Sequence, residues 1–187
     1  MPEDTLKDHN LVSSLPWYVL RVKHRHEKGV AQSLHAKGYE GFLPLYQARK
    51  RVFASRTDTH LPLLPGYVFC RLNIANRLPV LIIPGVFHIV QAGKLFPGVE
   101  ESEIQALQNI VSSGLYALPW PFLRAGQKVF LEEGPLRGLS GILTVVNEKP
   151  KVVVSVTLLQ RSVAVEIDRR WIRPISSPLE VRSRRAS

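Results

Sequence analysis

Between residues 16 and 113 the hydrophobic positions follow two different periods. Short runs rich in β-branched and aromatic residues, bounded by proline, glycine or polar clusters, are typical of strands and occur at 17–22, 42–47, 67–72 and 86–93. Between the second and third of these runs, two extended arms are expected to form a hairpin with a polar tip near 56–59. Helical spacing replaces the strand pattern at 24–38, 77–85 and 102–113. The pattern predicts an α+β domain with an antiparallel sheet flanked by helices.

The helix at 24–38 is indicated by Val30, Ala31 and Leu34, with Gly38 as its stop. In the last of these helices, Ser102 and Gln105 have the spacing of a capping box. The apolar stripe consists of Ile104, Leu107, Ile110 and Val111, and Gly114 is expected to close the helix.

Beyond residue 113 the helical period disappears. Residues 114–124 are broken by glycine and proline and show little periodicity, so we expect a linker. Strand-like runs with polar turns then continue to residue 175, at spacings typical of a small all-β barrel. The predicted organisation is a tail at 1–15, an α+β domain at 16–113, a linker at 114–124, a barrel at 125–175 and a disordered basic tail at 176–187.

The net charge of the chain indicates a class of binding partner. The 187-residue chain carries 25 Lys and Arg against 15 Asp and Glu, a net charge of +10, which favours attraction to a polyanion such as nucleic acid; a basic surface that only aids solubility is the alternative. The one cysteine, Cys70, lies in an apolar run and is expected to fill the core. With no apolar run long enough for a membrane span, we expect a cytoplasmic monomer that does not bind membranes.

Catalytic chemistry has little support in the sequence. There is no catalytic dyad, no phosphate-binding loop and no set of Cys and His at metal-ligand spacing, and the histidines and acids are dispersed. We therefore expect a protein that is not an enzyme and needs neither cofactor nor metal.

Two motifs carry a family resemblance. The stretch "GQKVFLEEGPLRGLSGILTVV" places glycines around a strand and its turn and resembles the KOW motif of small SH3-like barrels, and "KVVVSVTLLQRSVAVEID" is similar to the second half of such a domain. The run "LLPGYVF" at 63–69 resembles a signature of the NusG N-terminal domain. Further matches in the family's order are Trp17-Tyr18, Glu27, Pro44 and Pro84-Gly85-Val86. The resemblance covers roughly residues 16–175 and implies a NusG N-terminal domain followed by a KOW barrel.

The resemblance implies a binding surface for RNA polymerase. In the family, the turn and its tyrosine belong to an apolar patch that docks onto the clamp helices of the largest polymerase subunit. A rigid aromatic ring presented by a turn gives contact area at low entropic cost. The implied contact residues are Leu64, Pro65, Gly66, Tyr67, Trp17, Tyr18, Val86 and Phe87. A place in the core is the competing interpretation for each of them, above all for Trp17.

A basic face is implied as a second surface, which in the family approaches the non-template DNA of the transcription bubble. The residues that match it are Lys23, His24, Arg25 and Lys37. A merely solvated face is the alternative for any one of them. The arginines and lysine of the hairpin arms are a further, less supported set.

The KOW domain is implied to recruit another partner. Its turn at 158–161 corresponds to the loop that meets either the termination factor Rho or a small-subunit ribosomal protein, which makes Leu159 and Arg161 contact candidates. Barrel closure explains Leu158 equally well.

Within the family, "RHEKGVAQSL", "LPWPFLRAGQKV" and "LLQRSVAVEID" resemble the specialised paralogues around RfaH and UpxY-type antiterminators. The function implied is an elongation and antitermination factor acting at specific operons by suppressing pausing or termination. Two alternatives stay open: a general NusG-type elongation factor, and a ribosome-associated RNA-binding KOW protein. The β-branched residues of 151–167 predict a barrel in the free chain and disfavour a helical alternative.

Overall fold

A computed structural model describes residues 15–52, 55–121, 126–146 and 149–175. The expected tails at 1–15 and 176–187 lie, apart from Leu15, outside the described residues. The chain divides into two compact units, residues 1–105 and 106–187. Each unit is described by itself below.

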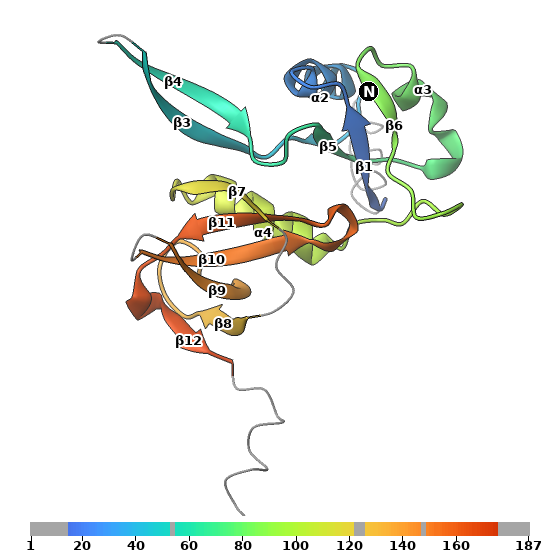
Figure 1. Cartoon of the computed structure of the whole chain (residues 1–187). Helices are drawn as coiled ribbons and strands as arrows, with labels where there is room; N and C mark the ends of the chain where they lie inside the picture. Colours follow the sequence, from blue (N-terminus) through green and yellow to red (C-terminus); the bar gives the residue numbers. More distant parts are fainter. Residues whose placement is uncertain (1–14, 53–54, 122–125, 147–148, 176–187) are drawn as a thin grey trace, which may run out of the picture. The chain divides into compact units, whose positions relative to one another are not determined.

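The first unit is built on a four-stranded antiparallel sheet with the order β2-β5-β1-β6. Figure 1 labels β5, β1 and β6 of this sheet. The strand β1 has the bounds predicted from its aromatic and β-branched run. The bounds are β1 Trp17–Val22, β2 Gly41–Phe42, β5 Tyr67–Arg71 and β6 Val86–Ile89. Opposite residues in β1 and β5 include Leu20 with Val68 and Val19 with Phe69. Because side chains alternate across a strand, Leu20 and Val68 face one side of the sheet, and Val19 and Phe69 the other.

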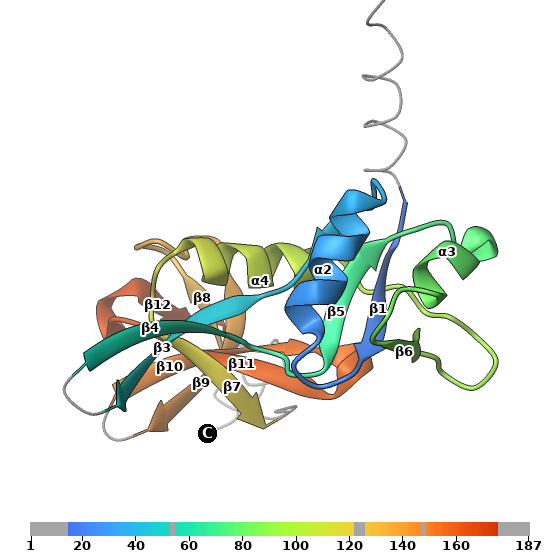
Figure 2. The same ribbon diagram turned by 90° about the horizontal axis from the view of Figure 1, so that it is seen from above.

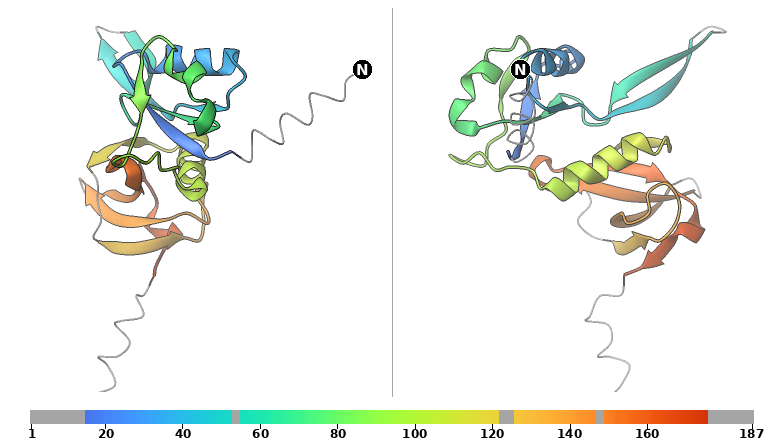
Figure 3. Two further views of the ribbon diagram at one scale, coloured as in Figure 1. Left: turned by 90° about the vertical axis from the view of Figure 1, so that its right-hand side faces the viewer. Right: turned by 180° about the vertical axis from the view of Figure 1, so that it is seen from behind.

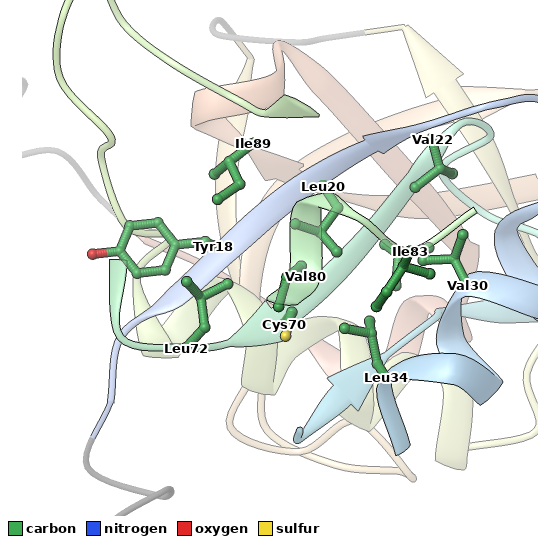
Figure 4. Packing of buried hydrophobic residues seen from close by; sticks show 11 residues of the cluster. Tyr18, Leu20, Val22, Val30, Leu34, Cys70, Leu72, Val80, Ile83 and Ile89 are labelled. Carbon is green, nitrogen blue, oxygen red and sulfur yellow. The ribbon is translucent and has the colours of Figure 1, made fainter. Parts of the chain in front are cut away.

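Helices cover the Leu20 side of this sheet. Figure 2 shows α2 (Glu27–Ala36) lying along β1 and β5, and α3 (Leu78–Leu81) follows the short 3-10 helix η1 (Ile74–Asn76). Side chains from the sheet and both helices form one buried cluster, part of which Figure 4 shows in close view; the buried members are Tyr18, Leu20, Val22, Val30, Leu34, Val68, Cys70, Leu72, Val80, Ile83 and Ile89. Burying this apolar surface is the main force that holds the helices to the sheet.

Cys70 belongs to this core, as its apolar setting predicted. The free thiol is fully buried. Burial, with a smaller contribution from the charge of Glu40, raises the pKa of the Cys70 thiol to about 12. Since the thiolate is the reactive form, the folded protein offers no nucleophile at this position near neutral pH.

A separate hairpin consists of β3 (Leu45–Val52) and β4 (Ser55–Pro62). Arg51 pairs with Arg56 and Val52 with Ser55, and residues 53–54 between them lie outside the described residues. The tip expected near 56–59 was therefore wrong, because those residues belong to β4. Polar residues occur in antiparallel strands as well as in turns, so polarity alone did not locate the chain reversal.

The helix α4 runs from Glu101 to Ser112 and buries Ile104, Leu107 and Ile110 of the predicted stripe. Val111 is 38% exposed, so the buried stripe is narrower than predicted. The helix begins one residue before Ser102, which puts Ser102 in the first turn rather than at the cap. Arg71 at the end of β5 fixes this start by donating two hydrogen bonds, of 2.7 and 2.8 Å, to the Glu101 carboxylate.

The second unit is an antiparallel sheet of six strands in the order β12-β8-β9-β10-β11-β7, which curls on itself in Figure 3. Short 3-10 helices, η2 (Thr157–Leu159) and η3 (Arg169–Trp171), connect its last strands. The strand bounds are β7 Ala117–Pro121, β8 Gln127–Leu131, β9 Ser140–Val146, β10 Lys149–Val156, β11 Arg161–Glu166 and β12 Ile172–Pro174. The expected fold class, an α+β part followed by an all-β part, is confirmed.

The strand β7 was not predicted, since residues 114–124 were expected to be a linker. It pairs with β11 along 117–121, with Leu118 opposite Ala164. The Glu166 N–H donates to the Tyr116 carbonyl oxygen at 3.0 Å, and because bonded pairs alternate in an antiparallel ladder, the nitrogens of Pro119 and Pro121 face away from β11. Proline is tolerated there because it loses no bond to β11. The prolines that suggested a linker thus form the outer edge of the sheet.

That edge leads to a first prediction. Replacing Pro119 and Pro121 together by valine restores two outward N–H groups on an edge strand, and such groups pair with other chains. We expect the double variant to shift toward dimers and larger species in analytical ultracentrifugation, relative to the wild type at equal concentration. The matched control replaces both prolines by lysine, which restores the N–H groups but adds charge, and should associate less. Identical sedimentation of the valine variant and the wild type would contradict a blocking role.

Candidate interaction surfaces

The turn from Leu64 to Tyr67 is fixed by bonds on both sides of Gly66. The Tyr67 N–H donates to the Leu64 carbonyl oxygen at 3.2 Å and closes the turn. The Gly66 N–H donates to Glu27 Oε1 at 2.9 Å, and the Val22 N–H donates to the Gly66 carbonyl oxygen at 2.9 Å. Gly66 has φ +82°, a conformation that glycine adopts without strain. The turn is therefore tied to both β1 and α2.

Tyr67 follows this turn as the first residue of β5, and its side chain is partly exposed. The guanidinium carbon of Arg21, directly opposite on β1, lies 4.8 Å from the centre of its ring. Such a cation–π contact is worth about 0.5–1 kcal/mol at an exposed site. A Cβ on Gly66 would lie 3.1 Å from the same guanidinium carbon. The guanidinium of Arg21 thus packs over the ring of Tyr67 at one end of the sheet.

A second Pro-Gly turn lies at the same end of the sheet. The Lys23 N–H donates to the Gly85 carbonyl oxygen at 2.8 Å, one residue after Val22 donates to Gly66. Gly85 has φ +97°, and a Cβ there would be 3.0 Å from His26 Cβ. The connection from β1 to α2 is consequently held between the two turns.

This connection carries the predicted basic residues. Lys23, His24, Arg25 and His26 are all exposed, and the His26 N–H closes a turn onto the Lys23 carbonyl oxygen at 3.0 Å. Arg25 has φ +67°, which is uncommon for a residue other than glycine and is found often at functional sites. Lys37 is also exposed, but it caps the other end of α2. The structure therefore groups Lys23, His24 and Arg25 in one loop and leaves Lys37 a helix length away.

Burial separates the candidates for the apolar patch. Trp17, Tyr18 and Leu64 are 1%, 7% and 2% exposed, Val86 is half-buried, and Phe87 is 63% exposed. Trp17 packs edge-on against Phe42, and Tyr18 is part of the core cluster. Pro65 is exposed on the turn itself. The partly or well exposed members are thus Pro65, Tyr67, Val86 and Phe87. Trp17 and Tyr18 are buried at the other end of β1, opposite Arg71 and Cys70.

The candidate turn of the second unit is the 3-10 helix η2, which ends at Gln160 in a left-handed conformation with φ 50°. Arg161 begins β11 and is exposed. Leu159 is 8% exposed, whereas Leu158 is half-buried. This burial reverses the roles expected for the two leucines, because the tight turn directs Leu159 inward.

Neither a metal site nor a membrane span occurs in the part of the chain that the structure describes. Across the described ranges, no three His, Cys, Asp or Glu side chains come together as a metal site would require. No helix within those ranges is both long and apolar enough to cross a bilayer.

Comparison with known proteins decides the family. The family model described as "Transcription termination factor nusG" matches residues 15–108, about half of the chain, which holds β1, α2 and both Pro-Gly turns. The chain belongs to the NusG family. It is 25% identical over 170 residues to the transcription termination/antitermination protein NusG of Buchnera aphidicola, covering 83% of this chain and 94% of that protein. It is therefore a NusG-family transcription factor.

A solved structure shares the fold of this NusG-family chain. "Domain interaction in Thermotoga maritima NusG" matches with a TM-score of 0.55 and 19% identity, covering 88% of this chain and 99% of that one. At this identity, the likeness supports the fold of the chain.

Two residues of the turn region were not among the predicted site residues of this NusG-family chain. Arg21 is the one charged residue in the run "WYVLRV", and His88 is opposite it on β6. Together with Tyr67 they form a row across three adjacent strands. The signal for Arg21 was available, because a charge in an otherwise apolar strand indicates a position that is not fully buried. The register that adds His88 could not be read from the sequence.

Proposed function

We propose that this NusG-family chain binds RNA polymerase through the first unit and suppresses pausing or termination, at specific operons. The observation that carries the proposal is the turn at 64–67, whose backbone is bonded on both sides and which presents the partly exposed ring of Tyr67. The part of the polymerase that this turn is proposed to bind is the clamp helices of the largest subunit. Rigid aromatic residues beside well-packed supports are the usual centres of protein–protein binding energy.

The apolar contact consists of Pro65, Tyr67, Val86 and Phe87, each at least partly exposed. Leu64 is buried within the turn, and Gly66 provides the backbone conformation of the turn. Trp17 and Tyr18 are buried at the other end of β1 and stabilise the sheet. Binding that favours the closed clamp shifts the polymerase population away from its paused form without any chemical step.

The loop of Lys23, His24 and Arg25 is proposed to contact the non-template DNA strand. It is joined to the polymerase-binding turn through Val22, the last residue of β1, which bonds to Gly66, while Lys23, the next residue, bonds to Gly85 of the second turn. Lysine and arginine attract the phosphate backbone, which supplies affinity without sequence selection. Lys37 adds positive charge at the far end of α2.

The KOW part, proposed to span 125–175 after an N-terminal domain of 16–113, recruits a second partner. Arg161 and the half-buried Leu158 offer its contact surface, whereas Leu159 is buried. The partner is Rho or a small-subunit ribosomal protein.

The proposed function is tested by offering the full chain to core RNA polymerase and to ribosomes in parallel. Retention by core polymerase supports the proposal. Retention by ribosomal RNA alone would contradict it and favour a ribosome-associated RNA-binding protein.

The basic loop gives a prediction of its own. In a variant with Lys23→Gln and Arg25→Asn, we expect weaker binding to a single-stranded DNA oligonucleotide and a smaller salt dependence. The slope of log affinity against log salt should fall by about 0.7 for each phosphate that the variant no longer neutralises. Asparagine is chosen because it tolerates the positive φ of residue 25. The measurement is a fluorescence-anisotropy titration at several salt concentrations.

The control for this variant is Lys94→Gln, which removes an exposed lysine from another loop of the same unit. If the loop variant and Lys94→Gln had the same slope of log affinity against log salt, the loop would be an ordinary solvated surface.

A further inference from the structure

Glu27 is a buried charge at the start of α2. Glu27 is 3% exposed. Among the described residues, Glu27 and Lys151 are the charged residues that are buried. Removing a carboxylate from water is costly unless hydrogen bonds or opposite charges compensate. The first turn of a helix is favourable for a negative charge, but it does not require that the carboxylate be buried. The position of Glu27 therefore needs a specific partner.

That partner is the polymerase-binding turn. Glu27 Oε1 accepts the hydrogen bond from the Gly66 N–H at 2.9 Å, across 39 residues of sequence. The carbonyl oxygen of Gly66 accepts from the Val22 N–H at 2.9 Å, and Arg21 Nη1 lies 3.4 Å from the same oxygen. Glu27 thus completes the bonding of Gly66, the residue that directly precedes Tyr67.

Glu27 also borders the basic loop. Its Oε1 lies 3.8 Å from His24 Nδ1, and the side chain of His24 is 73% exposed. The same carboxylate is consequently within reach of both surfaces: the turn that presents Tyr67 and the loop that carries Lys23, His24 and Arg25.

We propose that Glu27 is a positioning residue that holds the 64–67 turn in the conformation that binds polymerase. The proposal rests on the proposed function for its consequence in binding, but not for its structural part. Loss of the carboxylate frees the Gly66 N–H, lets the turn move relative to β1 and α2, and leaves Tyr67 without a fixed orientation. Glutamine keeps an acceptor oxygen at the same distance along the side chain, so it should preserve the turn.

The structural part is tested by amide hydrogen exchange in the full-length, ¹⁵N-labelled chain. In Glu27→Ala, exchange of the Gly66 amide should accelerate by about 10-fold or more, the factor expected for losing a hydrogen bond to a charged group. Exchange of the Val68 amide, opposite Leu20 in the core of the sheet, serves as the internal reference for global stability. Glu27→Gln should stay close to wild type, and Glu100→Ala, which removes an exposed carboxylate, should change neither amide.

The binding part uses the same variants with core RNA polymerase. Affinity should fall by about 10-fold in Glu27→Ala and be largely restored in Glu27→Gln. Equal acceleration of Gly66 and Val68, or of neither, would overturn the positioning role, as would a faster Gly66 amide with unchanged polymerase affinity. If the wild-type chain itself does not bind polymerase, the proposed function fails, whereas the exchange ratio still decides whether Glu27 holds the turn.

Discussion

Replacing Tyr67 by alanine should weaken binding of the full chain to core RNA polymerase by about 30-fold or more, which corresponds to roughly 2 kcal/mol for a central aromatic contact. The ring is partly exposed, lies under the Arg21 guanidinium and follows a turn bonded on both sides of Gly66. Its removal takes away binding surface without opening the core. Biolayer interferometry with immobilised core polymerase measures the effect.

The Tyr67 variant needs two controls. Tyr67→Phe keeps the ring and should retain most of the affinity. Tyr116→Ala removes an exposed tyrosine from the other unit and should leave the affinity unchanged. Wild-type affinity in Tyr67→Ala would show that the ring is not the centre of the interface.

The second large effect concerns stability and falls two residues further along the same strand. Phe69 shares the sheet face of Tyr67, but it is 0% exposed, opposite Val19, and its ring centre lies 6.0 Å from that of Phe42. Removing a buried aromatic side chain leaves a cavity, so Phe69→Ala should lower the free energy of unfolding by about 3–5 kcal/mol. Urea denaturation followed by tryptophan fluorescence measures it.

Tyr67→Ala is the matched comparison for stability as well. Because its ring is only half-buried, we expect the free energy of unfolding to fall by less than about 1.5 kcal/mol. The two substitutions thus distinguish a residue that stabilises the fold, Phe69, from a residue that is expected to contact the polymerase, Tyr67, on the same face of β5. A decrease of equal size in both variants would mean that Tyr67 is part of the core.

Much of the fold could be predicted from local patterns. The strand β1 has the predicted bounds because its run of apolar residues begins after Pro16 and ends at the basic loop. The buried stripe of α2 follows from the helical spacing of Val30 and Leu34. These features depend on the neighbouring sequence alone, which is why periodicity detected them.

The features that were missed depend on pairing over long distances. The strand β7 is short and contains two prolines, so nothing local distinguishes it from a linker; its register with β11 determines that the prolines face outward. The bond from Gly66 to Glu27 joins residues 39 positions apart. The family resemblance included both Gly66 and Glu27, but the sequence did not indicate that these two residues are in contact.

The exposure of the candidate residues was likewise not evident from composition. Trp17 and Tyr67 are both large aromatic residues at strand starts, yet Trp17 is 1% exposed and Tyr67 is partly exposed. What separates them is the environment on their common face: Trp17 meets Phe42, with Arg71 over its ring, whereas Tyr67 lies at the end of the sheet beside the turn. Only the assembled sheet shows which aromatic residue a partner could reach.

Photo-crosslinking from position 67 tests directly whether the turn at 64–67 meets the polymerase clamp. A full-length chain carrying benzoylphenylalanine in place of Tyr67 is incubated with core RNA polymerase, irradiated, and the crosslinked peptide is identified by mass spectrometry, with the same substitution at exposed Tyr116 as the reference. We expect a crosslink from position 67 to the clamp helices of the largest subunit that position 116 does not form. Crosslinks from position 67 elsewhere on the polymerase, or none at all, would show that this turn is not the polymerase-binding surface.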